Sequence, residues 1–151
     1  MRIDIRNIQN KVKIDKKNIT ACAGFILNSM GEKSAELSIL FVDDEYIKKL
    51  NWKYRKVKNK TDVLAFPMRE GSGVSKANPL LGDVVISVET AKREAKKRKN
   101  LFQKELDLYL VHGILHLLGY DDVTSSDKKK MRSMEDKILR YWSKSHLGGG
   151  L

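Results

Sequence analysis

Hydrophobic and polar residues alternate along this chain with a period that changes from block to block. Blocks with a period of two predict strands, and blocks with a period near 3.6 predict amphipathic helices. The pattern predicts strands at residues 2–8, 35–42, 61–67 and 82–88. It predicts helices at residues 14–30, 43–55, 89–99, 101–119 and 125–142. We therefore expect an α+β fold, with a small mixed sheet of about four strands packed with about five helices.

The residues between these blocks indicate a single domain. Gly31 is placed to end the first predicted helix, and Pro67 to stop the third predicted strand. Residues 68–79 form a polar stretch with Gly and Ser, which predicts a loop. The sequence contains no internal repeat and no domain linker. We expect one domain over residues 1–144 and a flexible C-terminal tail over residues 145–151.

Composition favours a cytoplasmic protein. Hydrophobic residues make up 41% of the chain and charged residues 32%, which is ordinary for a globular domain. No run of 18 apolar residues occurs, and the first residues lack an apolar block, so neither a membrane span nor a signal peptide is expected. Cys22 is the single cysteine, which excludes an intrachain disulfide and agrees with a reducing compartment. We expect Cys22 to be a small core residue.

The charge of the chain is less ordinary. Thirty Lys and Arg residues against nineteen Asp and Glu residues give a net charge of +11. Such an excess favours a polyanionic partner, because each neutralised phosphate releases condensed counterions. The alternative is a lysine-rich solvated surface. The same alternatives hold for the basic run at residues 92–104, which either guides RNA or forms a solvated helix face.

The stretch HGILHLLGYDD, residues 112–122, carries the chemistry that the pattern does not explain. His112 and His116 are four residues apart in an apolar helix, so both imidazoles lie on one helix face. Gly119 is placed to end this helix and to turn the chain back, which would bring Asp122 in as a third ligand. Zinc accepts this set and leaves a fourth position for water. The alternative is that the histidines are hydrogen-bonded residues of a buried helix.

A peptidase is the first enzyme class that such a helix suggests. In the H-E-x-x-H proteases the residue after the first histidine is the glutamate that acts as general base. Here that residue is Gly113, which has no side chain to accept a proton. The peptidase interpretation stays open only if another carboxylate, such as Asp121, takes this role.

Four motifs of the chain resemble those of the YbeY family. They are LNWKYR at 50–55 (family L-N-x-x-Y-R), KTDVLAFP at 60–67 (T-D-V-L-S-F-P), LLGDVVIS at 80–87 (L-G-D-I-x-I-S) and HGILHLLGYDD at 112–122 (H-G-x-L-H-L-x-G-Y-D-H). Members of this family are metal-dependent endoribonucleases implicated in bacterial ribosomal RNA maturation and ribosome quality control. The resemblance implies an α+β fold in which a central, zincin-like histidine helix holds a zinc site that faces a positively charged cleft.

The resemblance also implies roles for individual residues. His112 and His116 match the first two metal-ligand positions, and Arg55 matches an arginine implicated in activity. We therefore expect Arg55 and His112 to be catalytic and one zinc ion to be held by His112, His116 and Asp122. Arg55 suits a phosphate, which its guanidinium can bind bidentately, although it could also be an exposed cation at a helix end. Asp122 stands where the family has a third histidine, and a carboxylate there could shift the preference toward a metal such as manganese.

The other matched residues are expected to support the structure. Thr61 and Asp62 are expected to cap or cross-link the backbone. Asp83 is expected to do the same, or to orient a metal ligand from behind. Trp52 and Tyr54 are expected in the core, with stacking on RNA bases as the alternative.

Motifs and charge together predict a single-strand-specific, metal-dependent endoribonuclease in the cytoplasm. Its expected partners are precursor ribosomal RNA, at the 3′ end of the small-subunit RNA, and the small ribosomal subunit. The ion would polarise the phosphate or activate water while Arg55 offsets negative charge. Two alternatives are a zincin-like metallopeptidase or other hydrolase, and a non-catalytic ribosome assembly factor with a structural metal.

Overall fold

The computed structural model describes residues 1–69 and 78–150, without the side chains of residues 146–150. Within this part of the chain there are four strands: β1 (Arg2–Asn7), β2 (Glu36–Val42), β3 (Val63–Pro67) and β4 (Leu80–Ser87). There are five helices: α1 (Lys16–Ser29), α2 (Asp44–Arg55), α3 (Val88–Lys97), α4 (Phe102–Leu117) and α5 (Ser125–Gly150). The predicted α+β class is therefore confirmed, with a mixed sheet of four strands.

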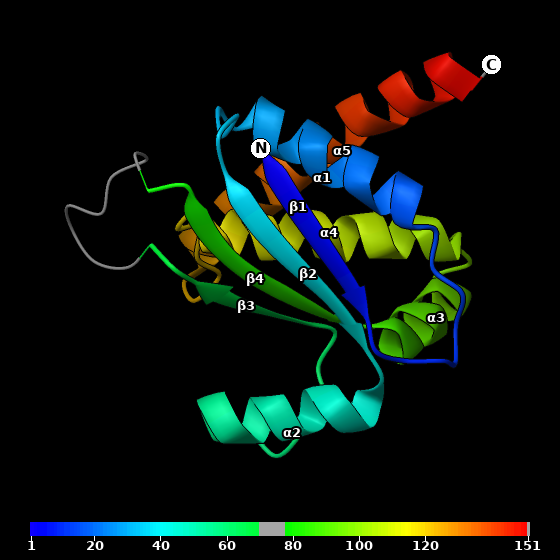
Figure 1. Cartoon of the computed structure of the whole chain (residues 1–151), viewed down its shortest axis with the longest axis vertical. Helices are drawn as coiled ribbons and strands as arrows, with labels where there is room; N and C mark the ends of the chain where they lie inside the picture. The colour runs from blue at the N-terminus through cyan, green and yellow to red at the C-terminus, as the bar shows by residue number, and fades with distance from the viewer. Residues whose placement is uncertain (70–77, 151) are drawn as a thin grey trace.

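The sheet has the strand order β1-β2-β4-β3 (Figure 1). Strands β1, β2 and β4 are parallel, and β3 pairs antiparallel with β4. Strand β3 is therefore an edge strand with one free side. The end of α2 lies near this strand, since the rings of Tyr54 and Phe66 have centroids 5.3 Å apart.

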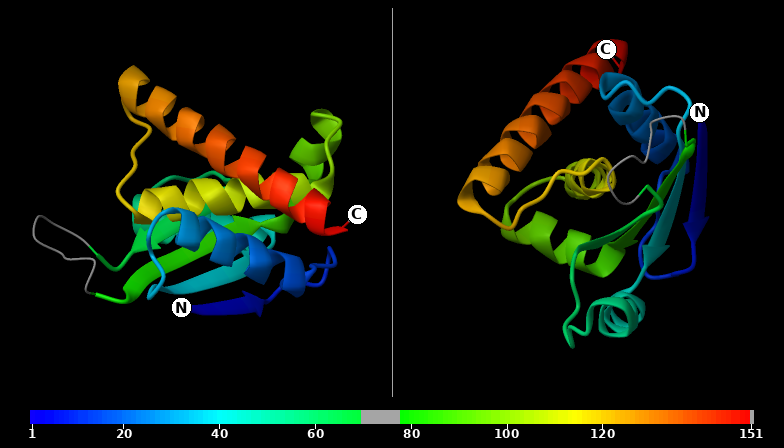
Figure 2. Two further views of the ribbon diagram at one scale, coloured as in Figure 1. Left: turned by 90° about the horizontal axis from the view of Figure 1, so that it is seen from above. Right: turned by 90° about the vertical axis from the view of Figure 1, so that its left-hand side faces the viewer.

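Helices cover the two faces of the sheet unequally (Figures 1 and 2). One face forms the main core with residues of α1, α3, α4 and α5. Helix α4 contacts β3, β4 and all three of the other helices, which explains why its sequence is apolar nearly all round. The opposite face carries α2 alone among the described helices, over a small cluster made by Val42, Ile47, Leu64 and Val85.

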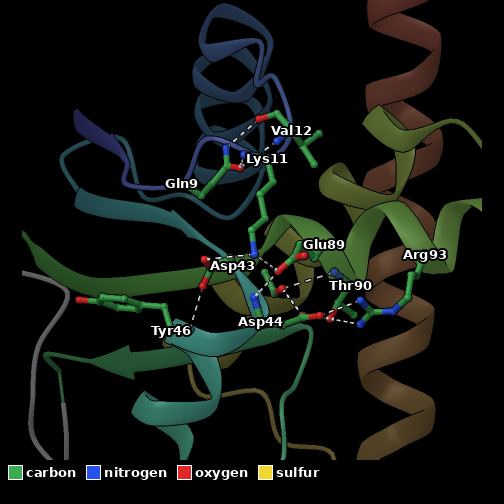
Figure 3. Close-up of polar contacts among 10 residues, drawn as sticks. Gln9, Lys11, Val12, Asp43, Asp44, Tyr46, Glu89, Thr90 and Arg93 are labelled. Atoms are coloured by element: carbon green, nitrogen blue, oxygen red, sulfur yellow. Dashed lines mark hydrogen bonds and ion pairs between the residues drawn. The ribbon is translucent and has the colours of Figure 1, made fainter.

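Helix α2 is held in place through a polar network at its first turn (Figure 3). The Asp44 carboxylate accepts hydrogen bonds from Ser87 Oγ at 2.7 Å, Thr90 Oγ1 at 2.8 Å and Arg93 Nη1 at 2.7 Å. The backbone N–H of Asp44 donates to Glu89 at 2.9 Å. Burial raises the pKa of Asp44, but the hydrogen bonds from Arg93, Ser87 and Thr90 outweigh it and hold the pKa below its ordinary value. The network thus fixes α2 to the start of α3.

Replacing Asp44 with asparagine is expected to destabilise the fold in a pH-dependent way. The lowered pKa means that ionised Asp44 stabilises the fold at neutral pH and that this contribution disappears as the pH falls through the folded-state pKa. Urea unfolding at pH 7 should show a loss of about 1–3 kcal/mol for Asp44→Asn. At pH 3 the difference from the unsubstituted protein should be smaller. The exposed Asp4→Asn is the control, and an equal loss at both pH values would contradict the role of the charge.

The predicted C-terminal tail and the predicted loop at residues 68–79 lie partly outside the described residues. Helix α5 continues to Gly150, past the predicted end at residue 142. The prediction was too short because it followed the apolar stripe, which stops at residue 142. Flexibility of residues 145–151 stays a prediction. The predicted loop at 68–79 lies largely in residues 70–77, which are outside the described residues. Among the described residues, no helix combines the length and apolar character that crossing a bilayer requires.

Cys22 lies in the main core, as predicted. Its side chain is fully buried on α1, and this burial raises the pKa of the thiol well above its ordinary value. The cysteine is therefore an inert core residue.

Candidate metal centre

The polar residues of three motifs meet in one cavity at the free edge of β3. The motif residues are drawn from the end of α2, the start of β3 and the end of α4. The polar side chains that line the cavity are Arg55, Thr61, Asp62, His112, His116, Asp121 and Asp122. Residues of α2 approach the edge strand from one face of the sheet and residues of α4 from the other, so the site depends on β3 being an edge strand.

Helix α4 and the turn after it position three candidate ligands. His112 and His116 lie one turn apart, with 3.0 Å between their Nε2 atoms. The helix ends in a turn at Gly119, whose φ of +98° is in the left-handed region that favours glycine. The chain then returns, and Asp122 Oδ2 lies 3.7 Å from His112 Nε2 and 3.6 Å from His116 Nε2. The structure thus brings together the three residues that the sequence analysis selected as ligands.

The other ring nitrogen of each histidine contacts an oxygen that accepts hydrogen bonds. His112 Nδ1 contacts the carboxylate of Glu135, and His116 Nδ1 lies 3.0 Å from the backbone oxygen of Tyr120. We therefore infer that both Nδ1 atoms carry hydrogen. In the neutral rings this leaves a lone pair on each Nε2.

Three electron-pair donors therefore point at one position. Two neutral imidazole nitrogens 3.0 Å apart, with a carboxylate oxygen beyond them, repel one another unless a cation lies between them. Tetrahedral zinc with bonds of 2.0–2.1 Å would place its ligand atoms about 3.3 Å apart, close to the observed distances. The three ligand atoms lie within 4.8 Å of one another. The residues fit a divalent metal ion, and the donor set does not by itself select zinc over manganese.

Glu135 of α5 is a site residue that the sequence analysis missed. Its side chain is only 12% exposed and holds the ring of the 27% exposed His112 from behind. Burial lowers the pKa of His112, but the hydrogen bond and charge of Glu135, with the charges of Asp62 and Asp122, raise it overall. A proton therefore competes with a metal ion for His112. The sequence signal was weak, because Glu135 is one of several acidic residues in a charged helix.

Replacing Glu135 with glutamine is expected to weaken metal binding. A carboxylate behind a histidine ligand fixes the ring and raises its basicity, and losing such a partner typically lowers metal affinity by about 10–100-fold. Calorimetric titration with zinc should show this loss for Glu135→Gln. The neighbouring Asp136 is exposed on the same helix, so Asp136→Asn is the matched control. Equal affinities for both variants and the unsubstituted protein would contradict the role assigned to Glu135.

Packing requires glycine at position 113, and a glycine cannot act as a base. A Cβ atom at this position would lie 2.6 Å from Val84 Cγ1, because α4 packs tightly on β4 here. A glutamate at the position used by the H-E-x-x-H proteases therefore does not fit in this fold. Asp121, the other carboxylate considered for that role, accepts a hydrogen bond from the backbone N–H of Asp122 at 2.7 Å and so shapes the ligand turn.

The remaining candidates divide between the site and the rest of the surface. Arg55 lines the cavity, and within the described part of the chain it forms no ion pair with a carboxylate. Asp62 caps the start of β3, one of the two roles predicted for it: it accepts hydrogen bonds from Val63 N at 2.8 Å and Thr61 Oγ1 at 3.2 Å. It also lines the cavity. Asp83 is exposed and lines a different hollow, beside Asp4.

The aromatic residues of the first motif are not where they were expected. Trp52 is 47% exposed and Tyr54 is 57% exposed, so the prediction that both belong to the core was wrong. The cluster beneath α2 is small, and in this helix only Ile47 and Asn51 are buried. The helix therefore has no apolar layer that could enclose a tryptophan.

Comparison with known proteins agrees with these observations. The sequence model of the family described as Endoribonuclease YbeY matches residues 4–143. The chain belongs to the YbeY family. Proteins named Endoribonuclease YbeY from Aquifex aeolicus and Pelotomaculum thermopropionicum are 42% and 41% identical to it. The first alignment covers 89% of each chain, and the second covers 92% of this chain and 95% of its relative.

The fold of this YbeY-family chain also resembles a solved structure. The solution structure of TM1509 from Thermotoga maritima matches with a TM-score of 0.65 and 25% sequence identity. The match covers 97% of this chain and 93% of TM1509.

Proposed function

We propose that this YbeY-family chain is a metal-dependent endoribonuclease that cleaves single-stranded RNA during ribosomal RNA maturation in the cytoplasm. The observation that carries the proposal is the convergence of His112, His116 and Asp122 in the cavity that Arg55 also lines. The names of its relatives and the net charge of +11 support RNA as the substrate. We further propose that it acts at the 3′ end of small-subunit ribosomal RNA and in ribosome quality control, in contact with the small subunit.

The side chains around the cavity have separate tasks in this reaction. His112, His116 and Asp122 would hold a divalent ion, which would supply Lewis acidity at the phosphate. Arg55 binds the phosphate through its planar guanidinium and offsets the negative charge that develops during cleavage. Asp62 lines the same cavity without being one of the three candidate ligands, and in this proposal its carboxylate accepts a proton.

The geometry disfavours the two alternative functions. A zincin-like peptidase would need a base at position 113, where a side chain meets Val84. A structural metal is normally enclosed by four protein ligands. Here three candidate ligands are found in the described residues, and Asp122 is 45% exposed beside an open cavity. An open coordination position is a feature of catalytic sites.

Cleavage of defined RNAs tests the proposal. The chelated protein should not cut a fluorescently labelled single-stranded RNA, and adding back zinc or manganese should restore cutting. The same sequence annealed to its complement should be resistant. A small-subunit RNA with an extended 3′ end should be shortened under the same conditions. Absence of cleavage with either metal, in protein shown by elemental analysis to be loaded, would overturn the proposal.

A further inference from the structure

The solvent-facing side of α2 carries an unusual aromatic residue. Trp52 is 47% exposed, whereas tryptophan is on average a highly buried residue. Two ammonium groups lie near its ring, Lys58 Nζ at 5.2 Å and Lys56 Nζ at 5.7 Å from the centroid. Lys48, Lys49 and Lys58 line a hollow beside the indole. We call Lys48, Lys49, Trp52, Lys56 and Lys58 the α2 strip.

The charge around the α2 strip is uncompensated. Between residues 46 and 61 the chain has no acidic residue and seven cations: Lys48, Lys49, Lys53, Arg55, Lys56, Lys58 and Lys60. Residues 52–60 are all exposed. Judged on the residues that the structure describes, none of the seven cations forms a salt bridge. Around α3, by contrast, Arg93 pairs with Asp44, and Arg98, just after the helix, pairs with Glu94 and Glu105. The α2 strip is therefore a region where positive charge is free for a polyanion and where no acidic residue interrupts it in the sequence.

The α2 strip leads directly to the candidate metal centre. Trp52 precedes Arg55 by three residues, so their side chains are neighbours on one helix face. Arg55 lines the metal cavity. Both α2 and α4 run toward the same end of the molecule, on opposite sides of the sheet (Figure 1; Figure 2, right). A strand of RNA with its scissile phosphate at Arg55 would meet Trp52 next. Glu45 borders the hollow at the start of the helix and would repel phosphate there.

We propose that the α2 strip binds the segment of single-stranded RNA that flanks the scissile phosphate. Trp52 stacks on an unpaired base, and the lysines contact the adjoining phosphates. This assignment rests on the proposed function and adds to it the surface that selects single strands. Every base presents a π face to an indole, so stacking tolerates any sequence. A duplex hides its base faces, so only the charge of the lysines would act on it.

Binding of RNA under chelating conditions tests the α2 strip without cleavage. The probe is a short fluorescein-labelled single-stranded RNA, and the readout is anisotropy in EDTA at several salt concentrations. Trp52→Ala should weaken binding by about tenfold, and Trp52→Phe should recover part of the loss because a ring remains. Replacing Lys48 and Lys49 together with glutamine should reduce the salt slope by about 1.4, for two phosphate contacts with a single strand.

Matched controls keep the result specific. Tyr141 is an equally exposed aromatic residue on α5, at 54%, so Tyr141→Ala should leave RNA affinity unchanged. The same RNA in duplex form should bind Trp52→Ala as well as it binds the unsubstituted protein. Since the side chain of Trp52 is 47% exposed and is not part of either core cluster, an altered circular dichroism spectrum is not expected.

The outcomes separate the α2 strip from the proposed function. If the unsubstituted chain binds and cleaves single strands while Trp52→Ala binds them equally well, the α2 strip is overturned and the function stands. An equal loss of affinity for single strand and duplex overturns the stacking role. If the unsubstituted chain neither binds nor cleaves RNA, the proposed function fails, and the α2 strip fails with it. A loss of affinity in Trp52→Ala that is confined to single-stranded RNA supports both the α2 strip and the proposed function.

Discussion

Replacing His112 with alanine is expected to abolish stoichiometric metal binding and RNA cleavage together while the chain stays folded. His112 supplies one of three converging ligand atoms, and its Nε2 lies 3.0 Å from that of His116. Its loss leaves two protein ligands, which do not hold zinc tightly. The histidine is partly exposed at the cavity wall, so its truncation removes little packing. We expect cleavage to fall below detection, because both Lewis acidity and an acidic water are lost.

Metal content and stability must be measured together for this variant. Elemental analysis of untagged protein should give about one ion per chain for the unsubstituted protein and a small fraction of that for His112→Ala. Thermal melting of the two chelated proteins should agree within a few degrees. Asp122→His is the informative companion, since it restores the histidine of the family motif and should retain or increase zinc. Full metal occupancy in His112→Ala would contradict the ligand set.

The elements of this fold were predictable because the apolar pattern of each strand and helix follows the sides that it buries. Helix α4 was the clearest case, since packing against the sheet and three helices requires apolar residues almost all round. Within it, two histidines on one face are costly unless they bind a partner, so their spacing marked them as candidate ligands. Gly119 and Asp122 followed from the need to end the helix and turn the chain back.

The parts that sequence reasoning missed depend on contacts between distant segments. Glu135 reaches His112 from 23 residues further along the chain, across the packing of α5 on α4. No local pattern distinguishes it from the other acidic residues of α5. The exposure of Trp52 depends on how little of the outer sheet face α2 covers, which a helical pattern does not show. From the sequence, Gly113 was interpreted only as a missing base. Its close packing against Val84 is visible only in the three-dimensional structure.

Replacing Arg55 with alanine is expected to reduce cleavage by about 10²–10³-fold while leaving the metal site intact. Arg55 lines the cavity from α2 and is not among the three candidate ligands, so metal content should be unchanged. Its guanidinium acts on the phosphate, and most of its effect should appear in the rate of the chemical step. Single-turnover cleavage with saturating protein separates this step from RNA binding.

Two further variants decide how Arg55 acts. Arg55→Lys keeps the charge but loses the planar fork, so its rate should lie between those of the alanine variant and the unsubstituted protein. Lys53→Ala removes a cation from the same helix outside the metal cavity and should lower the single-turnover rate only slightly. If Lys53→Ala and Arg55→Ala slow the reaction equally, Arg55 contributes only general attraction for RNA. If Arg55→Ala loses its metal, the arginine instead supports the ligand geometry. The expected pattern, a large loss of rate with full metal content for Arg55→Ala alone, places the guanidinium at the reacting phosphate.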